Sequence, residues 1–431
     1  MKIVINPLRP ALCNAAQDFH MLVRLQSEPQ MGCKRTPLSL VLVVDRSGSM
    51  SGSKIREAKR CMIDLVKRMD PTDRVGLVQY NDQVDTVMPI STVEQTGGMF
   101  EELVQSIIPS GSTALHAGWL RGADMLAPHA GRDEACHVIL LSDGLANHGL
   151  TNTDRICEQV AALAGAGVTT TTVGLGTDFN EELMSVMARA GQGRAHYGER
   201  AIDLAEIFDA EIGLLSQLQW RNVELCITSG QARLEMLNAY DRTEDGWRMP
   251  SVAMGSECWA LLRMPMGDAI RLQKECGTVL AVKAHATDVN GERVTFTGQM
   301  QTLTEVSWTE YGAQATHELV QRRMNELAAA QLQMQIRKAA LRDDWLRVRQ
   351  LLSQLEVLGQ HEPWVAASIA FARQLMEERD KPRMAKEMLY KSMKSDIRLS
   401  ALHEERFSPD IDSMSPAFLR RKVTEGRRTE P

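Results

Sequence analysis

Three separate segments of the sequence carry side-chain oxygens of the kind that bind a hard divalent cation. Asp45, Ser47 and Ser49 form an Asp-x-Ser-x-Ser pattern at the end of the apolar run SLVLVVD. Thr113 stands in the segment GSTAL, and Asp143 stands in LLSDG at the end of a second apolar run. Carboxylates and hydroxyls suit Mg²⁺, Mn²⁺ or Ca²⁺, whereas zinc prefers histidine and cysteine. The residue types therefore predict a divalent-cation site.

Each of these segments also has an ordinary structural explanation when it is taken alone. A serine-rich turn can cap the following helix, Thr113 can be an N-cap, and Asp143 before Gly144 can belong to a turn. Their joint occurrence favours the metal site, because two of the segments follow buried strands. Parallel sheets with helices on both faces bind their ligands at the carboxyl ends of the strands.

The elements that must position these residues alternate between β-branched runs and helical segments from Leu38 to about Gln217. Such alternation predicts a doubly wound, Rossmann-like α/β domain, which we place at residues 37–218. The expected strands are 39–45, 74–80, 137–143 and 168–176, with 84–89 as an antiparallel edge. Apolar residues at helical spacing predict a helix over 54–69.

Four stretches within this region resemble a von Willebrand factor type A domain with an intact metal-ion-dependent adhesion site. They are VLVVDRSGSMSGSKIREAK, GSTAL, LLSDG and VTTTTVGLGTDFNEELMSVMARAGQGRAHYG. The resemblance implies that Ser47, Ser49 and Thr113 bind the ion directly or nearly so. It also implies that Asp45 and Asp143 act largely through bound waters. Mg²⁺ is the expected ion, with Mn²⁺ and Ca²⁺ as alternatives, and an acidic group of a partner protein would complete its shell.

The rest of the chain predicts a small antiparallel β-sandwich and a helical region. Residues 219–308 alternate in polarity, and Asn290-Gly291 between two β runs predicts a tight hairpin. The strand expected at 18–26, within residues 1–36, can pair back into that sandwich. The segment MPSVAMGSECWALLRMPM resembles the β regions of bacterial and inter-alpha-inhibitor-like proteins. Residues 309–400 predict stacked helical hairpins, and residues 401–431 predict a weakly structured tail.

Composition excludes several classes of protein. The formal net charge of -6 argues against general binding to nucleic acids. The first residues contain no signal-peptide hydrophobic region, and no run of about 18 apolar residues follows, so we expect no membrane span and a cytoplasmic location. The 8 cysteines stand far apart, which is not the pattern of a secreted disulfide framework.

These observations favour a bacterial, non-enzymatic adaptor that captures a Glu or Asp of a partner protein through its bound cation. By resemblance, the partner would be an AAA-type ATPase or a component of a kinase or phosphatase system. Two alternatives remain open, namely a metal-dependent enzyme and a structural scaffold that acts through its helical region. His148 and Asn147 are candidates for the rim of the metal site, while the glycine and serine spacing after Asp45 does not match a phosphate-binding loop.

Overall fold

The computed structural model describes residues 1–28, 35–96, 98–131, 134–145, 148–176, 179–198, 203–228, 232–359, 363–395 and 399–401. The chain divides into two compact units. One unit contains Met31–Gln219 and Thr287–Glu292, and the other contains Met1–Gln30, Trp220–Ala286 and Arg293–Pro431. Within the described ranges, no helix combines the length and the apolar character that crossing a bilayer requires.

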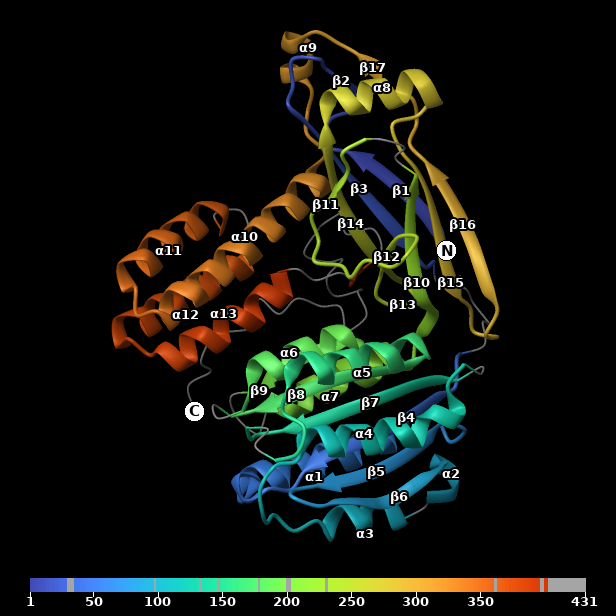
Figure 1. The fold of residues 1–431 in the computed structure, drawn as a ribbon, viewed down its shortest axis with the longest axis vertical. Helices are drawn as coiled ribbons and strands as arrows, with labels where there is room; N and C mark the ends of the chain where they lie inside the picture. The colour runs from blue at the N-terminus through green and yellow to red at the C-terminus, as the bar shows by residue number, and fades with distance from the viewer. Residues whose placement is uncertain are drawn as a thin grey trace. The chain divides into compact units, whose positions relative to one another are not determined.

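The unit built from Met31–Gln219 is a mixed α/β domain around one six-stranded sheet, as the sequence predicted (Figure 1). All neighbouring strands are parallel except the edge pair β5–β6, which is antiparallel. In spatial order the strands are β6 (Val84–Thr92), β5 (Arg74–Tyr80), β4 (Leu38–Asp45), β7 (Ala135–Ser142), β8 (Val168–Leu175) and β9 (Gln192–Gly198). Every residue of β4 and β7 is buried, because both strands lie inside the sheet and are covered on both faces.

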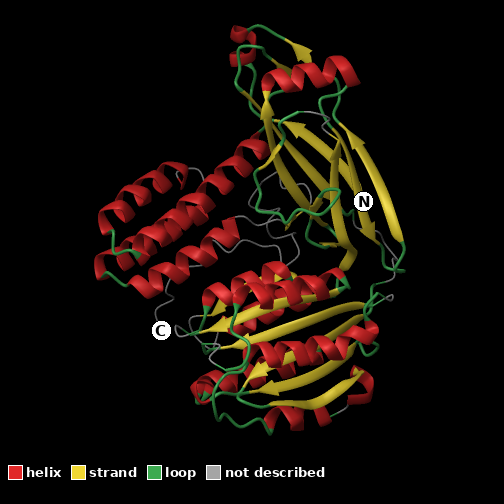
Figure 2. Ribbon diagram, in the orientation of Figure 1, coloured by secondary structure: helices red, strands yellow, loops and turns green. Residues whose placement is uncertain are grey.

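Helices cover both faces of this sheet (Figure 2). They are α1 (Ser53–Lys67), α2 (Val93–Thr96), α3 (Met99–Gln105), α4 (Leu115–Leu126), α5 (Thr153–Gly165), α6 (Glu181–Ala190) and α7 (Asp203–Leu215). The threonines of β8 show the two layers, because successive side chains of a strand point to opposite faces. Thr170 accepts a hydrogen bond from Trp119 of α4, whereas Thr171 donates to Glu211 of α7. The domain is therefore doubly wound.

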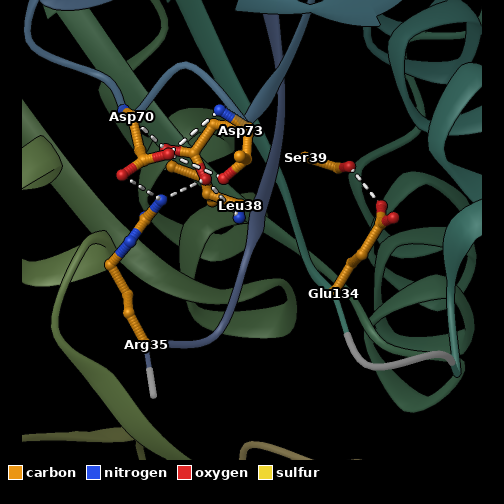
Figure 3. Close-up of polar contacts among 7 residues, drawn as sticks. Arg35, Leu38, Ser39, Asp70, Asp73 and Glu134 are labelled. Carbon is orange, nitrogen blue, oxygen red and sulfur yellow. Dashed lines mark hydrogen bonds and ion pairs between the residues drawn. The ribbon is translucent and has the colours of Figure 1, made fainter. Parts of the chain in front are cut away.

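The amino-terminal edge of the sheet is closed by hydrogen bonds within the domain (Figure 3). The buried carboxylate of Asp73 accepts from the backbone nitrogen of Leu38 at 2.8 Å and pairs with Arg35 at 2.7 Å. Glu134 accepts from the Ser39 hydroxyl at 2.6 Å. These contacts fix the start of β4, so the strand delivers Asp45 to the opposite edge.

Strand β9 and helix α3 are among the elements of this domain that were not predicted from the sequence. Strand β9 was not expected, because its side chains are only partly buried and its residues lack an apolar run. Helix α3 is too short for a clear helical period. The predicted edge strand at 84–89 is confirmed and extends to Thr92.

The second unit holds two sheets that share one apolar core. The first sheet contains β1 (Lys2–Pro7), β3 (Asp18–Gln26), β14 (Ser256–Pro265), β11 (Glu235–Met236) and β18 (Leu399–Ala401). The second contains β12 (Trp247–Arg248), β10 (Leu218–Thr228), β15 (Ala281–Thr287), β16 (Arg293–Gln299) and β13 (Val252–Ala253). A short parallel pair joins β2 (Ala11–Leu12) to β17 (Thr304–Glu305). Strand β3 pairs with β14 along its whole length, from Asp18 to Gln26, so the start of the chain is part of this unit.

Six helices complete the described part of this unit. They are α8 (Met266–Cys276), α9 (Trp308–Ala313), α10 (Glu318–Leu341), α11 (Trp345–Gly359), α12 (Pro363–Glu378) and α13 (Lys381–Ser395). Helix α10 packs against the first sheet through Leu319, Val320 and Leu327, which contact Trp259 and its neighbours. The guanidinium of Arg323 lies 4.7 Å from the centre of the Trp259 ring, and its charge is balanced by Glu326 at 2.8 Å. The helical region is thus fixed to the sheet by apolar and cation–π contacts.

Some details of this unit differ from the sequence prediction. The hairpin predicted at Asn290-Gly291 is confirmed, but the prediction that its turn has two residues was wrong. The turn runs from Asp288 to Glu292, and only Gly291 of the predicted pair has a positive φ, of 83°. The Asp288 side chain accepts from the backbone of Asn290 and Glu292, which stabilises the longer loop. Helix α8 was not expected within the sandwich region, and the predicted tail beyond Ala401 lies outside the described residues.

A close approach between α4 and β5 requires glycine at position 118. A Cβ at Gly118 would lie 2.5 Å from Cδ1 of the buried Tyr80 ring. We predict that Gly118→Ala lowers the stability of the full chain by about 1–3 kcal/mol, because overpacking outweighs the better helix propensity of alanine. Gly165→Ala in α5 is the matched control, since a Cβ there meets nothing within 4 Å, and it should raise stability slightly. Calorimetric unfolding measures both effects, and equal shifts would contradict the prediction.

Buried His137 gives the domain a specific sensitivity to acid. Burial lowers the pKa of His137 to about 4, and its Nδ1 lies 2.6 Å from the Thr169 hydroxyl. The unfolded chain binds a proton near pH 6.5 and the folded chain only near pH 4, so the stability contribution is complete above about pH 6.5 and is lost as the pH falls toward 4. The difference corresponds to about 3 kcal/mol. We predict that His137→Gln removes this part of the acid destabilisation. Denaturant unfolding of wild type and variant at about pH 6.5 and about pH 4 measures the effect. An equal loss of unfolding free energy in both proteins between these pH values would disprove the prediction.

Candidate metal-binding site

The two predicted aspartates meet because β4 and β7 are adjacent parallel strands. Val44 pairs with Leu141, so the carboxyl ends of both strands reach the same edge of the sheet. Asp45 is the last residue of β4, and Asp143 follows β7 directly. Both side chains are fully buried, at 0% exposure. Ser142 donates a hydrogen bond to Asp45 Oδ2 at 2.7 Å and thereby connects the ends of the two strands.

The segment after Asp45 folds back toward the strand ends. The backbone nitrogen of Ser47 donates to Asp45 Oδ1 at 2.7 Å. The hydroxyl oxygens of Ser47 and Ser49 lie 3.0 Å apart, and Ser49 donates to Asp143 Oδ1 at 2.7 Å. A short 3₁₀ turn, Gly48–Met50, inserts the buried Met50 beneath this segment before α1 begins. The hydroxyl groups of both serines are therefore held beside the two carboxylates.

Thr113 arrives on a third loop that hydrogen bonds to the first. Gly48 donates its backbone nitrogen to the carbonyl of Gly111 at 3.1 Å, and Ser110 donates to the carbonyl of Arg46 at 2.7 Å. Thr113 is 3% exposed. A Cβ built on Gly144 would lie 2.9 Å from Thr113 Oγ1 and 3.7 Å from Ser49 Oγ. The threonine hydroxyl is thus beside the same aspartate loop.

The structure therefore brings together all five residues that the sequence singled out. Four of them are buried, whereas Ser49 is exposed to solvent. Leu145, two residues after Asp143, is also exposed, at 58%. Of the two rim candidates, His148 donates its backbone nitrogen to the carbonyl of Thr113 at 3.3 Å, and Asn147 lies outside the described residues.

Burial has an electrostatic consequence for Asp45. It raises the pKa of Asp45 to about 6, against the hydrogen bonds from Ser142 and Ser47 that favour the charged form. The negative charge of Asp143 raises the pKa further. Two buried carboxylates next to each other need nearby positive charge, of which the Lys54 ammonium group supplies only one unit, and a hard cation among five oxygen donors fits this arrangement.

Two contacts of this cluster were not predicted from the sequence. The Ser142 hydroxyl holds Asp45, and Lys54 in the first turn of α1 forms an ion pair with Asp143 Oδ2 at 2.5 Å. Ser142 belongs to the segment LLSDG, but nothing in that segment distinguishes a carboxylate-binding serine from a strand residue. Lys54 had a usable signal, because a cation at the start of a helix opposes the helix dipole and needs compensation.

Comparison with known proteins agrees with the fold and with the order of these segments. Residues 39–210 match the family model of the von Willebrand factor type A domain. The chain therefore contains a von Willebrand factor type A domain.

An uncharacterized protein of Synechocystis is 26% identical over 194 residues, which is 45% of this chain and 45% of that protein. The inter-alpha-trypsin inhibitor heavy chain H3 of Mesocricetus auratus is 29% identical over 172 residues, which is 38% of this chain and 19% of that protein. The chain thus matches less than half the length of these relatives.

A solved structure, described as von Willebrand factor type A from Catenulispora acidiphila, has a similar fold beyond this domain. It aligns with a TM-score of 0.65 at 16% identity and covers 85% of this chain and 88% of that chain. At this identity the similarity shows the fold alone.

The packing around Gly144 leads to a prediction about metal binding. We predict that Gly144→Ala weakens Mg²⁺ or Mn²⁺ binding by about tenfold, or about 1.4 kcal/mol, because the new methyl group displaces the Thr113 hydroxyl without removing any ligand. Calorimetric titration of the full chain measures the change. Gly165→Ala is the control for an alanine placed in open space. Unchanged affinity in Gly144→Ala would show that Thr113 is not a ligand.

Proposed function

We propose that the type A domain binds a divalent cation through Asp45, Ser47, Ser49, Thr113 and Asp143, as a metal-ion-dependent adhesion site. The bound cation then captures an acidic side chain of a partner protein. The observation that carries this proposal is the convergence of these five oxygen-bearing side chains from three loops at one edge of the sheet, with Ser49 at the solvent side. The protein acts as a binding adaptor and not as an enzyme.

The chemistry of the donors supports Mg²⁺ as the ion, with Mn²⁺ or Ca²⁺ as alternatives. All five side chains offer oxygen, and three of them are neutral hydroxyls. Mg²⁺ and Ca²⁺ are bound by oxygen ligands, while softer ions prefer nitrogen and sulfur. Neutral hydroxyls donate less negative charge to the cation than carboxylates would. The cation therefore keeps enough of its charge to attract a carboxylate from outside.

Access supports a protein ligand. Asp45 and Asp143 are fully buried and Ser49 is the exposed member of the five, so we expect a visiting group to approach the site beside Ser49. A single carboxylate on a protruding side chain satisfies this geometry, and the exposed Leu145 next to Gly144 offers an apolar contact beside it. For partner identity we keep the expectation of an AAA-type ATPase or a kinase or phosphatase system component. A cytoplasmic, bacterial setting is part of the same proposal.

Removing one carboxylate tests this function directly. We predict that Asp143→Ala abolishes Mg²⁺-dependent capture of partner proteins by the immobilised full chain, because it removes a ligand and the acceptor of Ser49. The measurement is mass spectrometry of proteins retained from a lysate in Mg²⁺ and in EDTA. Asp209→Ala removes an exposed acid of α7 and should behave as wild type.

The outcomes separate the alternatives. Equal retention in Mg²⁺ and EDTA would contradict the proposal, and a double variant Ser47→Ala with Ser49→Ala that retains all partners would favour the structural scaffold. Turnover of a retained partner, lost in Asp143→Ala, would favour a metal-dependent enzyme. Circular dichroism of each variant checks that the fold persists.

A further inference from the structure

Lys54 is a cation built into the metal-binding cluster. Its Nζ lies 2.5 Å from Asp143 Oδ2, while the other oxygen of Asp143 accepts from Ser49. The lysine side chain is 26% exposed, and Asp143 is fully buried. The ammonium group therefore reaches from the surface to one of the two carboxylates on which cation binding depends.

The position of Lys54 in its helix is unfavourable by local rules. The first turn of α1 consists of Ser53, Lys54, Ile55 and Arg56, so cations stand at the positive end of the helix dipole. Acidic residues are the stabilising choice at this place. Conflicts between local preference and the observed residue are expected where a site is functional. Here the compensation comes from Asp143.

The neighbouring loop leaves room for the ammonium group. Gly176, at the end of β8, has a φ of 77°, and a Cβ built on it would lie 3.3 Å from Lys54 Nζ. Gly176 also donates its backbone nitrogen to the carbonyl of Gly198 at 2.9 Å, so Gly176 is fixed by β9. The ammonium group thus lies between Gly176 and the Asp143 carboxylate.

We propose that Lys54 is an internal counter-cation that competes with the divalent metal for Asp143 and so lowers the metal affinity of the site. This inference rests on the proposed function. In the metal-free domain, two carboxylates and one ammonium group give a net charge of -1 (-2 plus +1). Adding a divalent cation changes this to +1.

This change of sign gives Lys54 a second effect. A loaded site with a net positive charge attracts an acidic side chain more strongly than a neutral one would, because Coulomb interactions are strong in a partly buried cluster. Without Lys54 the loaded site would be neutral. Lys54 therefore weakens the binding of the metal and strengthens the capture of a carboxylate by the loaded site.

Titration of the full chain with Mn²⁺ or Mg²⁺ alone tests the inference. We expect Lys54→Met to bind the metal about tenfold more tightly, since about 1.4 kcal/mol of charge repulsion disappears. Lys54→Arg keeps the charge and should stay within about threefold of wild type. Lys67→Met is the matched control, because it removes the same charge from the other end of α1, about 20 Å away and beyond the screening length.

The possible results distinguish this inference from the proposed function. If wild type binds the metal and Lys54→Met binds it with equal or weaker affinity, the inference is overturned. Weaker binding by Lys54→Met would make Lys54 a positioning residue for Asp143. Failure of both wild type and Lys54→Met to bind Mn²⁺ or Mg²⁺ would overturn the proposed function itself. Thermal unfolding in EDTA confirms that each variant is folded before its affinity is compared.

Discussion

One electrostatic constraint decides how side chains are arranged at the carboxyl ends of β4 and β7. This constraint is the burial of Asp45 and Asp143 side by side. Adjacent parallel strands bring them together, and neither side chain reaches solvent. Buried charges are costly unless donors or cations accompany them. Such groups come from three different elements, namely Ser47 in the loop after β4, Ser142 at the end of β7 and Lys54 in the first turn of α1.

The hydroxyl groups of this cluster suit the proposed site both with and without a bound cation. A hydroxyl can donate a hydrogen bond to a carboxylate and can equally offer a lone pair to a cation. Ser49 donates to Asp143, and Ser47 lies 3.0 Å from Ser49. When a cation enters this cluster, the same hydroxyl groups would turn their oxygen lone pairs toward it, and no further side chains would be needed. Under the proposed function, this accounts for serine and threonine, rather than further carboxylates, around the two aspartates.

The sequence was sufficient to predict the parallel strands β4, β5, β7 and β8 and to single out the five candidate ligands, because buried strands leave continuous apolar runs and their ends are easily located. It was insufficient where packing between distant segments decides the structure. Lys54 and Ser142 are near the predicted ligands in sequence, yet their roles depend on which carboxylate each one reaches. Strand β9 has few buried side chains, and the turn after β15 is set by Asp288 rather than by the Asn-Gly pair.

The net charge of the site with and without the cation makes partner binding by the proposed adaptor depend on metal concentration. Coupling between two ligands is reciprocal, so a visiting carboxylate raises the cation's affinity by the factor by which the cation raises the visitor's affinity. With Lys54 in place, the metal alone binds a site that already holds a positive charge. The acidic visitor relieves that excess of charge when it arrives. Under the proposed function, metal and partner would stabilise each other on the protein, and the adaptor would hold its partner firmly only when the cation is bound.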